Sequence, residues 1–168
     1  MNPRERRLVA DLYQMKEISE QDQLSFEATG DPPEAYEVAI KAPGLALDGR
    51  RVVERDEHRF EVYLHRDYPR RPPVITWQTP VYHPNLLGPD RNGGVCIGAW
   101  RASESLADLV TRLVDLVSYR SFSLDDALDT DAASWIRRFA LEPGFDIREV
   151  LGVDVKEPDD LIKVEVKH

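Results

Sequence analysis

Apolar residues near the start of the chain recur with the period of an α-helix. They lie on one side of residues 3–17, at Leu8, Val9, Leu12 and Met15. The other sides carry charged residues, namely Arg4, Arg6, Arg7, Asp11 and Lys16. A repeat of three to four residues places the apolar set on one helical face, and Pro3 suits the first turn. The pattern predicts a surface helix whose apolar face covers a core.

Four later segments have the pattern of β-strands. They are residues 24–28, 35–41, 58–65 and 74–78. The second and third alternate strictly, with apolar faces formed by Tyr36, Val38, Ile40 and by Phe60, Val62, Leu64. Strict alternation places apolar side chains on a single side of a sheet. We expect a four-stranded antiparallel meander packed on helices, with residues 42–57 forming a long loop that contains a turn.

The second half of the chain returns to helical periodicity. Ser105 and Asp108 fit a capping box at the start of a helix with a broad apolar stripe. The stripe comprises Leu106, Leu109, Val110, Leu113, Val114, Leu116 and Val117. Because so many apolar side chains need cover, we expect this central helix to be the most buried helix of the protein.

Shorter elements are expected toward the C-terminus. Residues 124–139 fit a further helix, and residues 145–152 fit a helical turn after a Pro-Gly interruption. Apolar positions alternate again at 160–168, as in a late strand. We interpret the chain as one α+β domain, with a core at 1–140 and a structured C-terminal extension at 141–168.

The composition fits a folded protein and narrows its partners. The chain has 168 residues, of which 42% are hydrophobic, and a formal net charge of −9. Nucleic acids and anionic membranes bind basic surfaces, so neither is an expected partner. The charged start lacks the apolar run of a signal peptide, and no apolar run reaches the length of a membrane span. We therefore expect a cytoplasmic protein.

Cys96 is the only cysteine, which limits its chemistry. It cannot form an internal disulfide, and four scattered histidines complete no zinc site, so neither a metal nor a cofactor is expected. Between Val95 and Ile97 it fits a small apolar core residue. A cysteine hydrolase would need a histidine base, and the nearest in the chain is His83, constrained by Pro84. The local pattern alone favours the core residue.

A series of motifs around this cysteine changes the interpretation. YPRRPPVITW at 68–77 precedes VYHPN at 81–85, GGVCI at 93–97, Trp100 and the long amphipathic helix. This order resembles ubiquitin-conjugating enzymes, and the resemblance extends over residues 3–135. It implies their fold, with an N-terminal helix, a four-stranded antiparallel sheet, an active-site loop, a central helix and C-terminal helices. It also implies that the cysteine lies in a shallow groove.

The resemblance assigns roles to residues of this loop. Cys96 matches the cysteine that accepts a ubiquitin-like modifier as a thioester from an ATP-dependent activating enzyme and passes it to an amine on a protein target. Asn85 matches the asparagine whose amide stabilises the oxyanion or holds the loop. His83 and Pro84 match positions with a structural role.

Two further sets of residues follow from the resemblance. The family often places an acidic or small polar residue where the helix after the central one begins. Asp125, Asp126 and Asp129 occur there, and we select Asp126 to orient the amine, although aspartates also favour a helix start electrostatically. The first helix of the family helps to dock the activating enzyme, which makes its arginines candidate contacts unless they are simply solvated. These are Arg4, Arg6 and Arg7.

The sequence also departs from the family pattern. The interval from Asn85 to Cys96 is a few residues longer than usual, and Trp100 follows the cysteine early. Arg70 stands where many members present an aromatic residue to ligases. We therefore expect a divergent bacterial member, associated with phage defence, that works without a separate ligase. The alternative is a non-catalytic binding module of the same fold, of the RWD or variant type, although such modules typically lack the cysteine.

Overall fold

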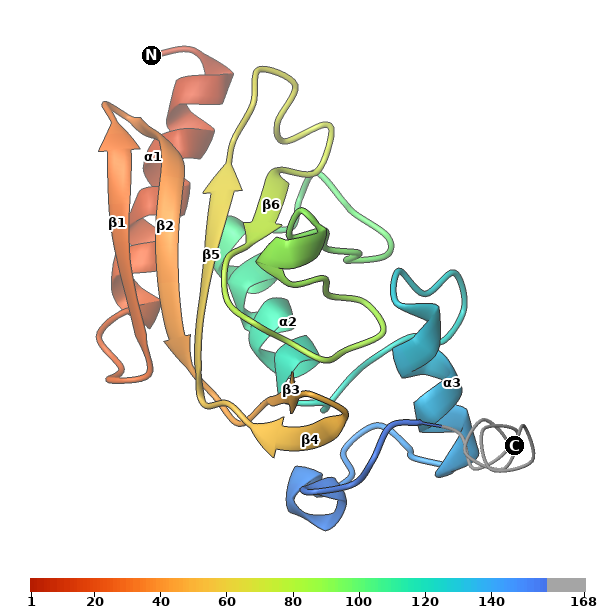
Figure 1. The fold of residues 1–168 in the computed structure, drawn as a ribbon. Helices are drawn as coiled ribbons and strands as arrows, with labels where there is room; N and C mark the ends of the chain where they lie inside the picture. Colours follow the sequence, from red (N-terminus) through yellow and green to blue (C-terminus); the bar gives the residue numbers. More distant parts are fainter. Residues whose placement is uncertain (157–168) are drawn as a thin grey trace, which may run out of the picture.

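The computed structural model describes residues 1–156 and contains a four-stranded antiparallel sheet. Its strands are β1 (Leu24–Gly30), β2 (Pro33–Lys41), β5 (Glu57–Tyr63) and β6 (Val74–Trp77), hydrogen-bonded in that order (Figure 1). All four strands expected from the alternation are present. The α+β fold class predicted from the sequence is confirmed.

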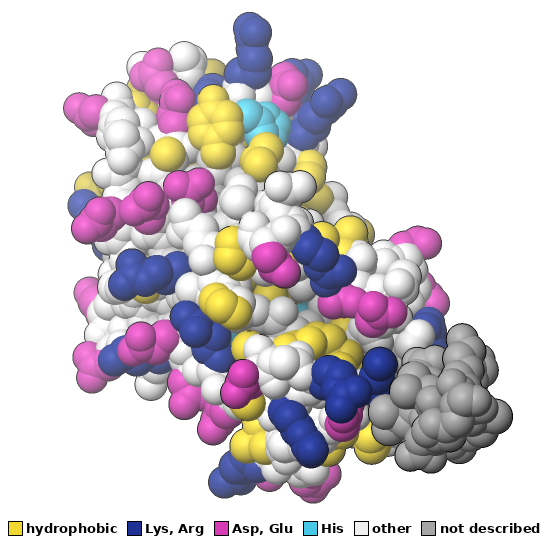
Figure 2. Space-filling view, in the orientation of Figure 1, with side chains coloured by type: hydrophobic (Ala, Val, Ile, Leu, Met, Phe, Trp, Pro, Cys, Tyr) yellow, Lys and Arg dark blue, Asp and Glu magenta, His cyan; other side chains and the backbone are white. Residues whose placement is uncertain are grey.

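Two helices cover one face of this sheet. Helices α1 (Pro3–Ile18) and α2 (Leu106–Val117) lie behind the strands in Figure 1. The inner face of the sheet supplies Tyr36, Val38, Ile40, Phe60 and Val62, all buried. Six residues of α2 are buried as well, and Ser105 and Asp108 form the expected capping box. The opposite face of the sheet, toward the viewer in Figure 2, is exposed and carries many acidic side chains.

The structure corrects the place of Asp11, which the periodicity assigned to the polar side of α1. Asp11 is buried and accepts hydrogen bonds from the Tyr68 hydroxyl at 2.5 Å and from the Leu106 N–H at 3.0 Å. Arg7 forms an ion pair with it at 3.1 Å. A buried carboxylate is tolerated when it is paired and hydrogen-bonded in this way. Asp11 thus joins α1 to the start of α2.

The prediction of a long loop at 42–57 is wrong, because this segment contains a β-hairpin. Strands β3 (Leu45–Asp48) and β4 (Arg51–Glu54) pair as a separate two-stranded sheet. The apolar residues of this segment were too few for alternation to be visible. Leu45 and Val52 are nevertheless fully buried, in a second hydrophobic cluster beyond the edge of the main sheet.

The predicted helix at 124–139 begins later than expected. Helix α3 spans Thr130–Arg138, and the Asp129 side chain caps it by accepting the Ala132 N–H. Residues 124–129 precede it as a loop, in which Asp126 has a φ of 54°. A left-handed backbone conformation cannot continue an α-helix. Asp126 is therefore a turn residue and not a helix-start residue.

The segment after α3 packs on the second cluster. A short 3-10 helix, η2 (Ile147–Val150), lies within the helical turn expected at 145–152. The backbone of Val153 and that of Val155 then bond to the β3–β4 hairpin. The strand predicted at 160–168 lies outside the described residues, and the division at residue 140 stays a prediction. None of the helices within residues 1–156 has the length and apolar character needed to cross a membrane.

Candidate active site

The loop that carries His83, Pro84 and Asn85 is buried beneath the surface. The Asn85 N–H donates to Nδ1 of His83 at 2.9 Å, and the imidazole packs on Tyr119 with a centroid distance of 4.6 Å. Burial lowers the pKa of His83 to about 3, so the ring is neutral near pH 7. These contacts agree with a structural role for His83 in the loop.

Cys96 is held beside this loop by its backbone. Its N–H donates to the backbone carbonyl of Asn85 at 3.0 Å, and the preceding residue, Val95, forms an antiparallel bridge with Leu86. The Cys96 side chain is a free thiol of intermediate exposure. Among the described residues no hydrogen bond joins the thiol to a histidine. Cys96 is therefore not a fully buried core residue, and its contacts within residues 1–156 do not include a Cys–His dyad.

The side-chain amide of Asn85 bonds entirely to one residue of a distant loop. Its Nδ2 donates to the carbonyl of Ser123 at 2.9 Å, and its Oδ1 accepts the Ser123 N–H at 2.9 Å. Asn85 is only 2% exposed. The pair of bonds links the cysteine loop to the segment before α3. Ser123 was missed by the sequence analysis, because nothing local marks a backbone partner 38 residues away.

The longer interval before Cys96 forms a compact turn. It contains a one-turn 3-10 helix, η1 (Pro89–Arg91), followed by Asn92 and Gly93 with positive φ values of 66° and 65°. The Gly93 carbonyl accepts the Trp77 N–H at 2.8 Å, and a β-carbon on Gly93 would clash with the Trp77 carbonyl oxygen. The extra residues thus fold back onto β6. They do not separate Asn85 from Cys96.

An acidic turn, defined here as residues 124–128, borders this loop. It carries Asp125 and Asp126, which are both exposed. Near its end, Leu128 approaches the cysteine segment, since a β-carbon on Gly94 would lie 3.7 Å from Leu128 Cδ1. Two carboxylates are therefore presented on a turn that touches the chain two residues before the cysteine.

The segment after Cys96 is held by a side chain of α2. Arg112 donates to the carbonyls of Ile97 and Ala99, and it forms an ion pair with Glu104 at 2.6 Å. Trp100 Nε1 donates to the Pro69 carbonyl at 2.8 Å. Arg112 was missed by the sequence analysis. Arg112 lies with Asp108 and Asp115 on the polar side of α2, so nothing local distinguished it from a solvated charge.

The three arginines of α1 have different surroundings. Arg4 donates to three carbonyls of the segment after β5, at 2.9 Å each, and Arg7 bonds to Asp11 and Tyr68. Arg4 and Arg7 therefore have internal structural roles, which the sequence analysis did not foresee. Arg6 is exposed and stays a candidate partner contact.

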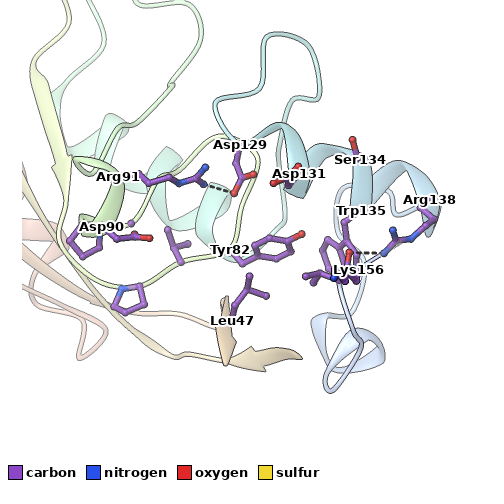
Figure 3. A pocket seen from close by; sticks show the side chains of 15 residues that line it. Leu47, Tyr82, Asp90, Arg91, Asp129, Asp131, Ser134, Trp135, Arg138 and Lys156 are labelled. Carbon is purple, nitrogen blue, oxygen red and sulfur yellow. Dashed lines mark hydrogen bonds and ion pairs between the residues drawn. The ribbon is translucent and has the colours of Figure 1, made fainter. Parts of the chain in front are cut away.

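A hollow of about 700 Å³ lies between α3 and the turn that joins Asn85 to Cys96, called the inserted turn below, and Cys96 does not line it. Figure 3 shows Arg91 of η1 extending to Asp129, and Tyr82 and Trp135 also line the hollow. Within residues 1–156, no group of three His, Cys, Asp or Glu side chains could hold a metal ion.

The chain is similar to curated proteins over about half of its length. It is 35% identical to Ubiquitin-conjugating enzyme E2 T of Bos taurus and to that of Homo sapiens, in each case over 89 residues. The match covers 48% of this chain and 43% of each relative. The chain therefore spans less than half the length of these relatives. Both are animal proteins, and the bacterial origin stays a prediction.

Solved structures show the same fold. A putative ubiquitin conjugating enzyme from Trypanosoma cruzi aligns with a TM-score of 0.59 and 22% identity, covering 80% of this chain and 90% of that one. A structure titled novel ubiquitin-conjugating enzyme aligns with a TM-score of 0.58 and 18% identity, over 79% and 84%. The sequence model described as ubiquitin-conjugating enzyme matches residues 15–140, which include the whole cysteine loop. The chain belongs to the ubiquitin-conjugating enzyme family.

Proposed function

We propose that the chain carries a ubiquitin-like modifier as a thioester on Cys96 and transfers it to an amine of a target. In the first step the Cys96 sulfur displaces the thiol of the activating enzyme from the modifier's C-terminal carbonyl. In the second step the amine nitrogen bonds to that carbonyl, the S–C bond breaks, and the amine proton passes to solvent or a nearby base. The Cys96 thiol is regenerated. ATP is consumed by the activating enzyme and not by this chain.

The partial exposure of Cys96 carries this proposal. A thiol on a bonded, extended segment can accept the C-terminus of another polypeptide, which a fully buried thiol cannot. The neutral, buried His83 also fits, because a strong base close to the sulfur would promote hydrolysis of a thioester that must persist until the target arrives. This property separates the proposal from a cysteine hydrolase.

The proposal is tested with ubiquitin, a ubiquitin-activating enzyme and ATP as the probe system. We expect the chain to form an adduct that reducing agent removes. Cys96→Ala should form none, and Cys96→Ser should form an oxyester that survives reducing agent. An adduct of unchanged yield in Cys96→Ala would contradict the assigned site. Absence of any adduct with a working activating enzyme would favour the non-catalytic binding module.

Asn85 and Asp126 have supporting roles in this proposal. Asn85 holds the active-site loop, since its Oδ1 and one N–H of its Nδ2 bond to the backbone of Ser123. Asp126 orients the incoming amine from the exposed acidic turn, with Asp125 as its neighbour. Free lysine as the acceptor checks this role, because Asp126→Asn should slow transfer to lysine and leave Cys96 thioester formation unchanged.

The proposal extends to the protein's partners. Arg6 contacts the activating enzyme from the exposed side of α1, so Arg6→Glu should slow charging of Cys96. Transfer proceeds without a ligase, which is consistent with the 84% exposed Arg70 side chain at the expected ligase surface. Transfer to lysine in the purified system, with no ligase added, tests this point directly.

A further inference from the structure

The acidic turn is attached to the cysteine loop at both ends. Its first end follows Ser123, which is bonded to the Asn85 side chain. Its last end leads into Asp129, whose N–H donates to the Pro84 carbonyl at 3.1 Å. The path of the turn is therefore set by bonds to the loop that also holds Cys96.

The second attachment is reinforced by Arg91 of the inserted turn. Its guanidinium lies 2.6 Å from Oδ2 of Asp129 (Figure 3). The other carboxylate oxygen of Asp129 accepts the Ala132 N–H of α3. The Asp129 side chain is 7% exposed, whereas the Arg91 side chain is 49% exposed. Burial of a carboxylate to this degree is offset by a paired cation and by hydrogen-bond donors. Asp129 has both.

We propose that Arg91 is a positioning residue for transfer of the modifier to an amine, an inference that rests on the proposed function. The Arg91–Asp129 latch ties the inserted turn to the end of the acidic turn. It thereby holds the two exposed carboxylates of that turn beside the cysteine segment, where an acceptor amine arrives. Arg91 touches no reacting atom. The residues inserted between Asn85 and Cys96 thus supply a specificity element for the acceptor.

The latch predicts a defect confined to the second step. Wild-type and Arg91→Ala proteins are charged with ubiquitin, the activating enzyme is then quenched, and loss of the thioester is followed against free lysine concentration. We expect the rate of Cys96 charging in Arg91→Ala to be within twofold of wild type. The slope of the rate of thioester loss against lysine concentration, called the lysine slope below, should be about tenfold lower in the variant. The intercept, which measures hydrolysis, should not change. Hydroxylamine, a small and strong nucleophile that needs no orienting carboxylate, should discharge both proteins at equal rates.

Asp129→Asn provides a matched variant that separates positioning from folding. Asparagine keeps the helix cap, because its side-chain oxygen still accepts the Ala132 N–H, but it has no charge to pair with Arg91. Arg91→Ala leaves a buried carboxylate unpaired, so it should lower the melting temperature more than Asp129→Asn does. The two variants should nevertheless show the same lysine defect. The double variant should be no slower than either single one.

Two further variants complete the test. Arg91→Lys retains the charge and should recover at least half of the lysine slope. Arg148→Ala removes an arginine from an exposed pair with Asp146 on η2, at 3.1 Å, and should leave the slope unchanged.

The outcomes distinguish this inference from the proposed function. An unchanged lysine slope in Arg91→Ala would overturn the proposed role of the Arg91–Asp129 pair. So would a lysine slope that falls in parallel with the melting temperature across the variants. Neither result would contradict thioester formation on Cys96. A wild-type protein that forms no Cys96 thioester would overturn the proposed function itself.

Discussion

Cys96 is supported on two sides by groups of different chemistry. On the upstream side, His83 and Asn85 are buried and their hydrogen bonds join neutral groups, although Ser123, the partner of the Asn85 side chain, is itself exposed. On the downstream side, Arg112 is 35% exposed and holds its segment through a charge-assisted contact with Glu104 and bonds to carbonyls. Gly98 and Ala99 in that segment are exposed.

The difference shows how one loop combines order with access. Buried neutral bonds cost much to break, because an unsatisfied partner would remain in a dry environment. Half-exposed charged contacts are weaker, because water and salt compete for them. The upstream side therefore fixes the position of the cysteine, and the downstream side leaves its segment open toward solvent. Four measurements would break or sharpen this contrast.

The largest effect should come from acid acting on the upstream side. The pKa of His83 is about 3 in the folded chain, because of burial, and about 6.5 when unfolded. Below pH 6.5 the unfolded chain therefore binds a proton that the folded chain refuses, so stability is complete above that pH and is lost as the pH falls toward 3. The loss should reach roughly 4 kcal/mol. Urea unfolding at a series of pH values measures it.

His83→Gln is the matched variant for this measurement. Buried His58, whose pKa is also lowered by burial, acts in the same direction and is retained, so the difference between the two proteins isolates His83. The variant should be less stable at pH 7 and should show a shallower pH dependence below 6.5. Equal pH dependence in both proteins would show that His83 does not carry the acid sensitivity.

Removing the Asn85 side chain should have the next largest effect. Asn85→Ala removes two hydrogen bonds of a buried side chain and leaves a cavity in its place, which should cost about 3 kcal/mol of unfolding free energy. Hydrogen exchange at Ser123 should accelerate at the same time. Asn85→Asp keeps the acceptor for the Ser123 N–H but turns a carboxylate oxygen toward the Ser123 carbonyl at a buried site, so it should lose at least as much. A cost below about 1 kcal/mol for the alanine variant would mean that the upstream side is not the firmer one.

Arg112→Ala should cost less, about 2 kcal/mol, because its contacts are partly hydrated. Hydrogen exchange should increase at residues 97–104 and not in the upstream loop. In wild type, 1 M salt should weaken the downstream support and leave the Asn85–Ser123 pair unaffected. Arg112→Lys keeps the positive charge but lacks the planar guanidinium with its several N–H donors. It should recover about half of the unfolding free energy that Arg112→Ala loses. Salt-independent exchange at 97–104 would contradict the assigned chemistry.

The smallest effect should come from Trp100→Phe. The variant keeps an aromatic ring beside Tyr68 but loses the hydrogen bond from Nε1 to the Pro69 carbonyl. This loss should lower the free energy of unfolding by about 1 kcal/mol. Urea unfolding measures the change, and charging of Cys96 should continue. A loss near 3 kcal/mol would show instead that this tryptophan is a main anchor of the downstream side.

The sequence alone determined the elements that depend on local periodicity. The helical repeat located α1 and α2, and the alternation located the four strands of the sheet, because the 3.6-residue and 2-residue periods are properties of neighbouring residues. The motif order around Cys96 also identified the family. These features could be read without knowing which segments meet in space.

Only the tertiary structure decided how the loop around Cys96 is held. The contacts of Asn85 with Ser123 and of Arg91 with Asp129 each join residues 38 positions apart. The β3–β4 hairpin, the burial of Asp11 and the late start of α3 were likewise set by packing partners from elsewhere in the chain. No local pattern encodes such pairings, because a side chain acquires its role from whichever distant backbone group the fold brings to it.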